Sequence, residues 1–246
     1  MASSCHPLQF ASDLLLVQTG AARVNLLAIE TSTEFLSLAL SRGEAVHAHH
    51  QAAGQRHAEL ILDSIRALLG RANLELGDLE GIAYGEGPGS FTGLRIGCGV
   101  GQGLALARGL RVLGVSTLLA LAEEAASDRV VACLDARMGE VYHAAYRRGA
   151  GAWETVHAPG LRRPQDCPVP EGRGWSGIGS GFAAYGPVLK ERFGPALERI
   201  EAAPTPTASA VLRLARARFG RGEGQPAESA IPVYIRDKVA LKTNER

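Results

Sequence analysis

Few residue patterns in this chain could carry chemistry by themselves. His47, His49 and His50 could ligate a metal, because His47 and His49 fall on one face of a predicted strand. No carboxylate or cysteine partner is evident near them, so an exposed strand is the preferred interpretation. Ser90 lies in a glycine-rich turn but lacks the Gly-x-Ser-x-Gly context of a hydrolase nucleophile. Neither pattern indicates a catalytic centre.

The most informative segment is the glycine- and proline-rich turn at residues 85–97. It follows an apolar run and leads into a helix pattern that continues to about Arg108, with Ser90 or Thr92 as its N-cap. Glycines recur at every fourth position in two rows, Gly93, Gly97 and Gly101 in one and Gly99 and Gly103 in the other. A glycine inside a helix costs about 1 kcal/mol relative to alanine, so we expect a compensating close contact with another backbone.

Three partners fit such a close approach to the glycine helix. The first is another segment of the same chain, which would make the glycines a packing feature. The second is another protein, and the third is a phosphate at the N-terminus of the helix. The residues alone leave these three alternatives open.

The order of apolar patterns predicts an α/β protein in which one layout occurs twice. Strands are predicted at 24–30, 35–41, 45–51, 79–84, 112–115, 130–134 and 140–146, and helices at 57–70, 90–108, 117–126, 182–193 and 208–220. The strands at 24–30 and 130–134 both end just before a hairpin, so we expect two lobes of similar topology.

The predicted boundaries follow from this repeat. We expect an N-terminal lobe at 24–126 and a C-terminal lobe at 127–222, in which residues 149–180 form loops with short strands. A linker and an extended tail are predicted at 223–246. Residues 1–23 are predicted to be a disordered extension. They are either native or the result of a start codon assigned too far upstream, with the true start at Val24 or its neighbour. A signal peptide is not expected there, because no positively charged stretch precedes the short apolar patch.

Composition narrows the class of protein. The 26 Lys and Arg residues nearly balance the 25 Asp and Glu residues, which argues against this chain as the main RNA-gripping subunit of any complex. The four cysteines are far apart and form no Cys-x-x-Cys pair, which argues against a zinc cluster and favours a reducing cytoplasm. No apolar run approaches the length of a membrane span.

Five blocks, in this order and spacing, resemble the TsaB (YeaZ) family, the dimerisation subunits of the bacterial tRNA threonylcarbamoyladenosine machinery. They read LLAIETS at 26–32, GPGSFTGLRIG at 87–97, LGVST at 113–117, DARMGEVY at 135–142 and PVYIR at 232–236. The blocks extend over nearly the whole chain from residue 24. The second and fourth are specific, whereas the first is shared with the catalytic relative, TsaD.

The resemblance implies an actin/Hsp70/sugar-kinase-like (ASKHA) fold, two lobes each built on a mixed sheet flanked by helices. It implies a partner role beside a TsaD-like catalytic subunit and a TsaE-like ATPase, with tRNA contacted only through the complex. In this fold the turn at 30–32 contacts a nucleotide phosphate, and Asp135 at the second turn could sit near a cation, so Thr31, Ser32 and Asp135 are nucleotide-binding candidates. Glu30 would repel a phosphate, so we prefer a hydrogen-bonded turn there and an Asx turn from Asp135 to Arg137.

The chain departs from the catalytic relative in one segment. TsaD proteins carry two metal-binding histidines four residues apart after a Gly-Val pair, where this chain has Thr117 and Leu121. Neither side chain can replace an imidazole on a transition metal. We therefore expect no catalytic residues, no metal and no cofactor of the chain's own, and leave open a nucleotide at the subunit joint.

The glycine helix is the predicted joint with TsaD, and with a second copy when that partner is missing. Its predicted contact residues are Ser90, Phe91, Thr92, Gly93, Leu94, Arg95, Gly97 and Gly101. On this hypothesis, leucine at Gly97 or Gly101 abolishes pairing and leaves the monomer folded. The rival functions are an ATP-dependent kinase or ATPase of the same fold and a metallopeptidase of the glycoprotease type.

Overall fold

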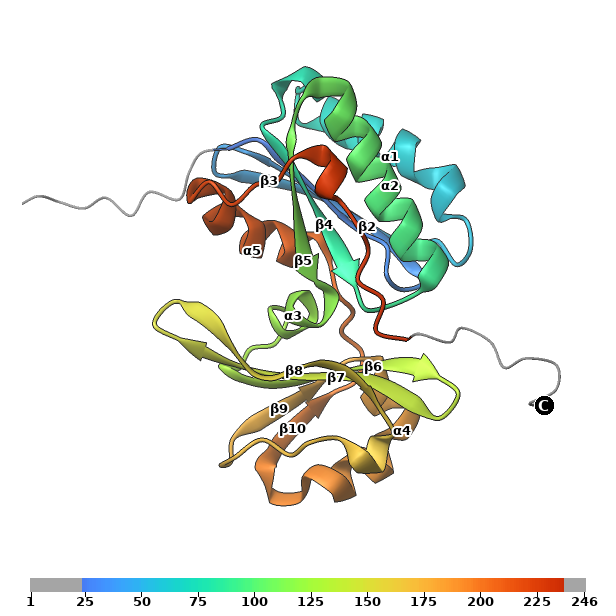
Figure 1. The fold of residues 1–246 in the computed structure, drawn as a ribbon, viewed down its shortest axis with the longest axis vertical. Coiled ribbons are helices and arrows are strands. Elements are labelled where there is room, and N and C mark those ends of the chain that lie inside the picture. Colours follow the sequence, from blue (N-terminus) through green and yellow to red (C-terminus); the bar gives the residue numbers. More distant parts are fainter. Residues whose placement is uncertain (1–23, 237–246) are drawn as a thin grey trace, which may run out of the picture.

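The structure, a computed structural model, describes residues 24–236 and contains two mixed five-stranded sheets (Figure 1). The first sheet has the strand order β3-β2-β1-β4-β5 and the second has the order β10-β9-β6-β7-β8. In each sheet a three-stranded antiparallel meander is followed by two strands in parallel pairing. The same layout therefore occurs twice, and the predicted ASKHA-like architecture of two lobes is confirmed.

The strand bounds agree closely with the predicted ones in the first lobe. The first sheet contains β1 (Leu26–Glu30), β2 (Phe35–Arg42), β3 (Ala45–Ala52), β4 (Gly81–Gly87) and β5 (Arg111–Ser116). The second contains β6 (Arg129–Arg137), β7 (Glu140–Gly149), β8 (Ala152–Arg162), β9 (Trp175–Ile178) and β10 (Leu197–Glu201).

Five α-helices within residues 24–236 cover the sheets. They are α1 (His57–Arg71), α2 (Phe91–Arg108), α3 (Thr117–Ala122), α4 (Ser180–Phe193) and α5 (Ala208–Gly220). In the first lobe α1 and α2 pack on one face of the sheet and α5 packs on the other. In the second lobe α3 and α4 occupy opposite faces. None of these helices is long and apolar enough to span a membrane.

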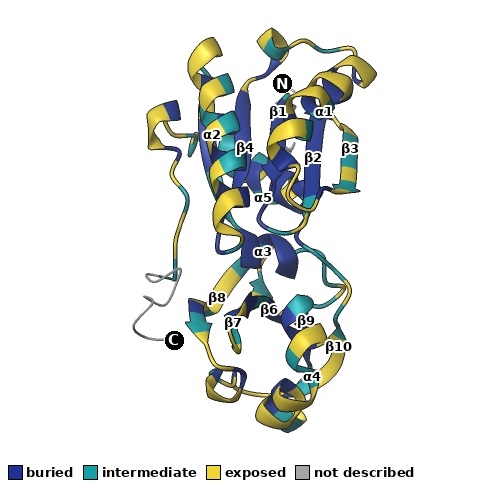
Figure 2. Cartoon of the chain, turned by 90° about the vertical axis from the view of Figure 1, so that its right-hand side faces the viewer, coloured by how far each residue is buried: buried dark blue, intermediate teal, exposed yellow. Residues whose placement is uncertain are grey.

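The central strand β1 explains why the first lobe holds together. All five of its residues are buried, as expected for a strand covered on both faces (Figure 2). Leu27 and Ile29 join the apolar cluster under α1 and α2, while Leu26 and Ala28 join the cluster under α5. Because alternate side chains point to opposite faces, one apolar strand supplies both cores.

The structure corrects four predicted assignments. Residues 149–180 contain the long edge strand β8, and β10 forms the other edge of the same sheet, where no strand is predicted. Helix α5, placed by sequence in the C-terminal lobe, packs on β1, β2 and β4 of the first lobe. The segment after α5 is not a free linker, because Gln225 pairs with Val112 of β5. Residues 1–23 and 237–246 lie outside the described part of the chain, as do the predictions for them.

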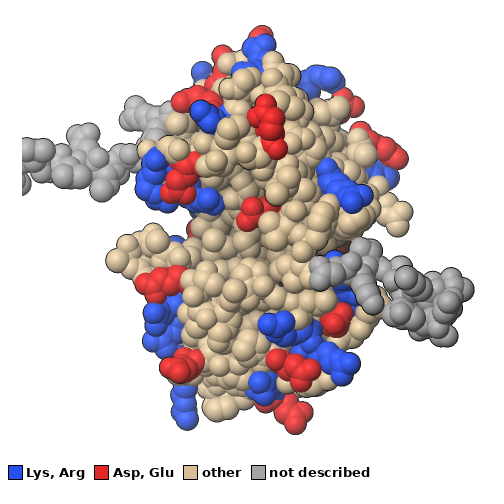
Figure 3. Space-filling model, in the orientation of Figure 1, with Lys and Arg blue, Asp and Glu red and all other residues tan. Residues whose placement is uncertain are grey.

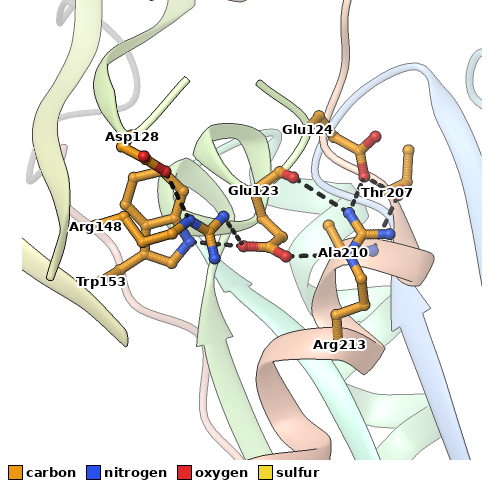
Figure 4. Close-up of polar contacts among 8 residues, drawn as sticks. All are labelled: Glu123, Glu124, Asp128, Arg148, Trp153, Thr207, Ala210 and Arg213. Carbon is orange, nitrogen blue, oxygen red and sulfur yellow. Dashed lines mark hydrogen bonds and ion pairs between the residues drawn. The ribbon is translucent and has the colours of Figure 1, made fainter. Parts of the chain in front are cut away.

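Glu123 joins the two lobes next to α3 (Figure 4). Its carboxylate accepts hydrogen bonds from Arg148 Nη2 in β7 (2.9 Å) and from Trp153 Nε1 in β8 (2.6 Å). It also accepts one from Arg213 Nε in α5 at 3.1 Å. Burial raises the pKa of Glu123, but the hydrogen bonds from Trp153 and Arg213 and the charge of Arg148 outweigh burial, so the net shift lowers it. The ionised carboxylate therefore ties α5 to the sheet of the other lobe.

We expect Glu123→Ala to lower the free energy of unfolding by about 2 kcal/mol, because it leaves two arginines without their shared carboxylate. The effect falls below that of a fully buried pair since the two arginine side chains are 34% and 48% exposed. Urea denaturation measures it. Glu154→Ala is the matched control: Glu154 pairs with Arg147 but both side chains are 54% exposed, so a change of at most about 0.5 kcal/mol is expected. Equal losses in the two variants would contradict the assignment.

Candidate functional site

Helix α2 begins and ends where the sequence predicts. The Ser90 side chain accepts a hydrogen bond from the Gly93 N–H at 3.3 Å and so caps the N-terminus. At the other end Gly109 has φ of 63°, the left-handed conformation that terminates helices at low cost for glycine. The helix is thus held in place by its own capping residues.

One glycine row of α2 packs against the chain's own first lobe. A Cβ at Gly93 would overlap the Thr31 carbonyl oxygen, and one at Gly97 would overlap the Thr31 hydroxyl. That hydroxyl donates a hydrogen bond to the Gly93 carbonyl oxygen at 2.8 Å. At Gly101 a Cβ would lie 3.5 Å from Ile82, an ordinary packing distance. The close partner of this row is therefore the end of β1 and the turn that follows it, within the same chain.

The other glycine row faces outward. A Cβ at Gly99 or Gly103 would have no neighbour within 4 Å. Two large apolar side chains on the same helix are also exposed, Phe91 at 37% and Leu106 at 52%. We call this surface the outer face of α2; its residues are Phe91, Thr92, Arg95, Gly99, Gly103 and Leu106. It combines apolar groups with a stretch of accessible backbone.

The eight residues predicted for the joint divide into two groups. Ser90, Phe91, Thr92 and Arg95 are exposed, whereas Gly93, Leu94, Gly97 and Gly101 are buried in their own lobe. The expectation that leucine at Gly97 leaves the monomer folded is wrong, because its side chain would overlap Thr31. At Gly101 a leucine would overfill the contact with Ile82. The spacing of the glycines predicts both rows, but only the burial of each glycine in the structure shows which row faces inward.

Arg95 organises the N-terminal end of the outer face. Its guanidinium lies 3.8 Å from the centroid of the Phe91 ring, and its Nε donates to the Tyr234 hydroxyl at 2.9 Å. The Phe91 and Tyr234 rings are 5.2 Å apart. A cation beside two rings is a stabilising arrangement, so the chain's C-terminal segment is fastened to this end of α2.

A cavity of about 790 Å³ lies between the lobes, and Ser32 and Asp135 line it from opposite sides. Asp135 Oδ1 accepts from the Arg137 N–H at 2.8 Å, and Oδ2 accepts from Arg137 Nη1 at 3.0 Å. The predicted Asx turn is confirmed. Thr31 is not among the lining residues, because its hydroxyl is used inside the first lobe. Nucleotide contact by Ser32 and Asp135 stays a prediction.

The turn after β1 is organised by a buried carboxylate. Glu30 is 2% exposed, and its Oε1 accepts from the Ser32 N–H at 2.7 Å. Its Oε2 accepts from the Thr117 hydroxyl at 3.4 Å. Burial raises the pKa of Glu30, and the hydrogen bonds from Ser32 and Thr117 partly oppose that shift. The hydrogen-bonded turn is confirmed; because the Ser32 N–H is already bound, it is not free to cradle a phosphate.

Thr117 and Leu121, which stand where TsaD proteins carry metal-binding histidines, have structural roles in this chain. Thr117 is fully buried on Glu30, and Leu121 lies in the apolar core of the second lobe. His47, His49 and His50 lie on β3, an exposed edge strand as predicted. Within residues 24–236 no three His, Cys, Asp or Glu side chains are placed to hold a metal ion together.

Charge is dispersed over the surface. On the face in Figure 3 basic and acidic side chains are interspersed on both lobes. This agrees with the balanced composition and does not mark a single basic surface among the residues drawn in colour.

Comparison with known proteins places this geometry in a family. Residues 45–243 match the family model "TsaD: tRNA N6-adenosine threonylcarbamoyltransferase". The "tRNA threonylcarbamoyladenosine biosynthesis protein TsaB" of Escherichia coli is 38% identical in an alignment of 227 residues that covers 89% of this chain and 97% of that protein. The Haemophilus influenzae protein of the same name is 33% identical in an alignment of 234 residues that covers 89% of this chain and 96% of that one.

A solved structure agrees with this assignment. YeaZ from Pseudomonas aeruginosa is 38% identical and has a TM-score of 0.80, with 86% of this chain and 99% of that chain covered. Since the similarity extends along nearly the whole length of each of these proteins, the chain belongs to the TsaB (YeaZ) family.

Proposed function

We propose that this chain is a non-catalytic subunit of the machinery that makes threonylcarbamoyladenosine in tRNA. In this proposal it binds a TsaD-like transferase and supports transfer of threonylcarbamoyl to N6 of the adenosine beside the anticodon. The observation that carries the proposal is the similarity to E. coli TsaB over 97% of that protein. The scattered cysteines suggest that it acts in the cytoplasm.

The outer face of α2 is the surface that we assign to the transferase. Gly99 and Gly103 leave the helix backbone accessible, while Phe91 and Leu106 offer apolar anchors beside it. Exposed apolar groups around a smooth backbone suit close helix-to-helix packing. Without the transferase the same face would join two copies of this chain.

A supporting rather than a catalytic role is favoured by the residues at positions 117 and 121. The family model that matches this chain describes a transferase, so the distinction rests on side chains. The Thr117 hydroxyl donates a hydrogen bond to Glu30, and Leu121 packs in the apolar core of the second lobe. Neither side chain is a good transition-metal ligand. We therefore assign no catalytic residue, metal or cofactor to this chain itself.

The remaining partners enter through the assembled complex. A TsaE-like ATPase would join the transferase, and tRNA would be contacted through the complex. A nucleotide, if one binds this chain, would enter the cavity between Ser32 and Asp135. We do not propose a kinase or peptidase activity.

Reconstitution tests the proposal. TsaD, TsaE, tRNA and threonylcarbamoyl-adenylate are combined with and without this chain, and modified adenosine is measured by mass spectrometry. We expect modification with all components, at least tenfold less when this chain is left out, and none from this chain with tRNA and the adenylate alone. Modification that is equally fast without the chain would refute the supporting role, and transfer by the chain alone would refute its non-catalytic status.

A further inference from the structure

The last described segment, Ala230 to Arg236, runs from the first lobe to the second (Figure 1). It follows a short 3-10 helix, Ala227–Ser229, that packs on α2. In Figure 2 the same segment descends beside α2 toward the second sheet. We call residues 230–236 the clasp, because they contact both lobes.

Backbone hydrogen bonds attach the clasp to the first lobe. The Val233 N–H donates to the Glu86 carbonyl oxygen at 2.7 Å, and the Ile231 N–H donates to the Tyr84 hydroxyl at 3.1 Å. Gln102 Nε2 of α2 donates to the Ala230 carbonyl oxygen at 3.2 Å. Three residues of the clasp are therefore held on β4 and α2.

Two side chains, Arg236 and Ile235, attach the clasp to the second lobe. Arg236 Nη2 donates to the Ala136 carbonyl oxygen at 2.9 Å and to Glu140 Oε2 at 2.8 Å. The Arg236 side chain is only 14% exposed, so these charge-assisted bonds are partly shielded from water. Ile235 also packs against the apolar cluster of the second lobe.

The two attachment points lie close together along the chain. Val233 is bound to the first lobe through its backbone and Arg236 to the second through its side chain. Three residues of extended chain, at most about 10 Å, and one arginine side chain therefore connect the two points. A larger separation of the lobes on this side must break one of the two attachments. The clasp therefore limits how far the lobes can move apart.

The clasp also forms part of the cavity wall. Val233, Tyr234, Ile235 and Arg236 line the cavity between the lobes. Arg236 holds the β6–β7 turn, where Arg137 and Met138 have positive φ of 62° and 56°. Non-glycine residues seldom adopt this conformation, so contacts to the turn help to fix its shape. The clasp thus contacts both the lobe junction and the turn that carries Asp135.

The lobes are also connected outside the clasp, by α3 and by the chain between β10 and α5. Helix α3 contacts both sheets, and Glu123 joins β7 and β8 to α5 (Figure 4). In Figure 1 the clasp lies on one side of α3 and the β7–β8 hairpin on the other. With the clasp released, the lobes would stay connected around α3.

We propose that residues 230–236 act as a releasable clasp that holds the lobes closed, and that breaking the Arg236 attachment opens the cavity around α3. The inference uses contacts within this chain and does not depend on the proposed tRNA function. Hinged closure of two lobes around a cavity is a known type of protein motion. Here the device that controls it would be the chain's own C-terminal segment.

Arg236→Gln tests the clasp in the full-length chain. Spin labels at Leu62→Cys on α1 and Val188→Cys on α4, both exposed positions in different lobes, report the distance between the lobes. We expect a longer and broader distance distribution than in the labelled parent. We also expect hydrogen exchange at residues 135–138 to become about tenfold faster, because the turn loses its fixed contact.

Arg147→Gln is the matched control, since the Arg147 side chain, within residues 24–236, donates hydrogen bonds only to Glu154 of the same lobe. It should leave both readouts unchanged. Glu140→Gln is a second test, because it weakens the same attachment from the other side and keeps Arg236 in place. If the distances and exchange of Arg236→Gln and Glu140→Gln equal those of the control, the clasp does not hold the lobes and the proposal is wrong.

Discussion

Gly99→Gln and Gly103→Gln are expected to weaken binding to the transferase subunit at least about 100-fold, equivalent to about 2.7 kcal/mol. A glutamine on the outer face of α2 would keep a partner helix from approaching the backbone. The same changes should raise the chain's own stability by up to about 1 kcal/mol, because glutamine is the better helix former and meets no neighbour. Calorimetric titration measures the affinity, and thermal unfolding measures the stability.

Gly70→Gln is the matched control for these variants. Gly70 is an exposed glycine near the end of α1, where a Cβ would also have no neighbour within 4 Å. It should stabilise the chain similarly and leave transferase binding unchanged. Gly97→Ala is the contrasting variant, expected to lose about 2 kcal/mol of stability because its methyl would crowd Thr31. Unchanged affinity in Gly99→Gln and Gly103→Gln would remove the outer face from the proposal.

The two glycine rows show which features of the site can be predicted from the sequence. The four-residue repeat of glycines is visible in the sequence, and it predicts that another backbone packs closely against the helix. Which row faces inward depends on how α2 is rotated on the sheet, and that is fixed by Thr31 and Ile82 from distant parts of the chain. The two rows therefore have different explanations. Packing within the chain accounts for Gly93, Gly97 and Gly101, while Gly99 and Gly103 remain accessible.

The fold could be predicted where strands are buried and could not where they form edges. The strand β1 is recognisable because its first four residues are apolar, and all five of its residues are buried. The edge strand β8 is mostly exposed and contains Pro159 and Gly160, so its local sequence suggests a loop. Its pairing with β7 stabilises it as a strand, although the local sequence pattern does not predict one.

Long-range packing also explains the misplaced helix. Each sheet is followed in the chain by a helix that packs at the other lobe: α3 follows β5 and packs on β6 and β7, and α5 follows β10 and packs on β1 and β2. A boundary drawn along the sequence cannot represent this exchange. For the same reason the role of Glu123 could not be predicted from the sequence, because its three hydrogen-bond partners lie 25, 30 and 90 residues away.

Lowering the pH from 7.5 to 5 should destabilise this chain by about 2 kcal/mol through His143 alone. His143 lies in the second lobe and is 1% exposed, and its Nε2 atom has no hydrogen-bond partner among residues 24–236. Burial, with the nearby His157 and Arg162, lowers its pKa to about 3. The unfolded chain takes up a proton near pH 6.5 and the folded chain does not, so stability is lost as pH falls from that value toward 3.

Urea denaturation at pH 7.5 and 5 measures this loss, and His143→Leu should remove most of it. The leucine also eliminates a buried nitrogen that lacks a partner, so the variant should be at least as stable as the parent at pH 7.5. A smaller pH dependence should persist, because burial also lowers the pKa of His157. His50→Leu, on the exposed edge strand β3, should retain the full loss of the parent. If His143→Leu loses as much stability as the parent between the two pH values, the buried imidazole is not the source of the acid sensitivity.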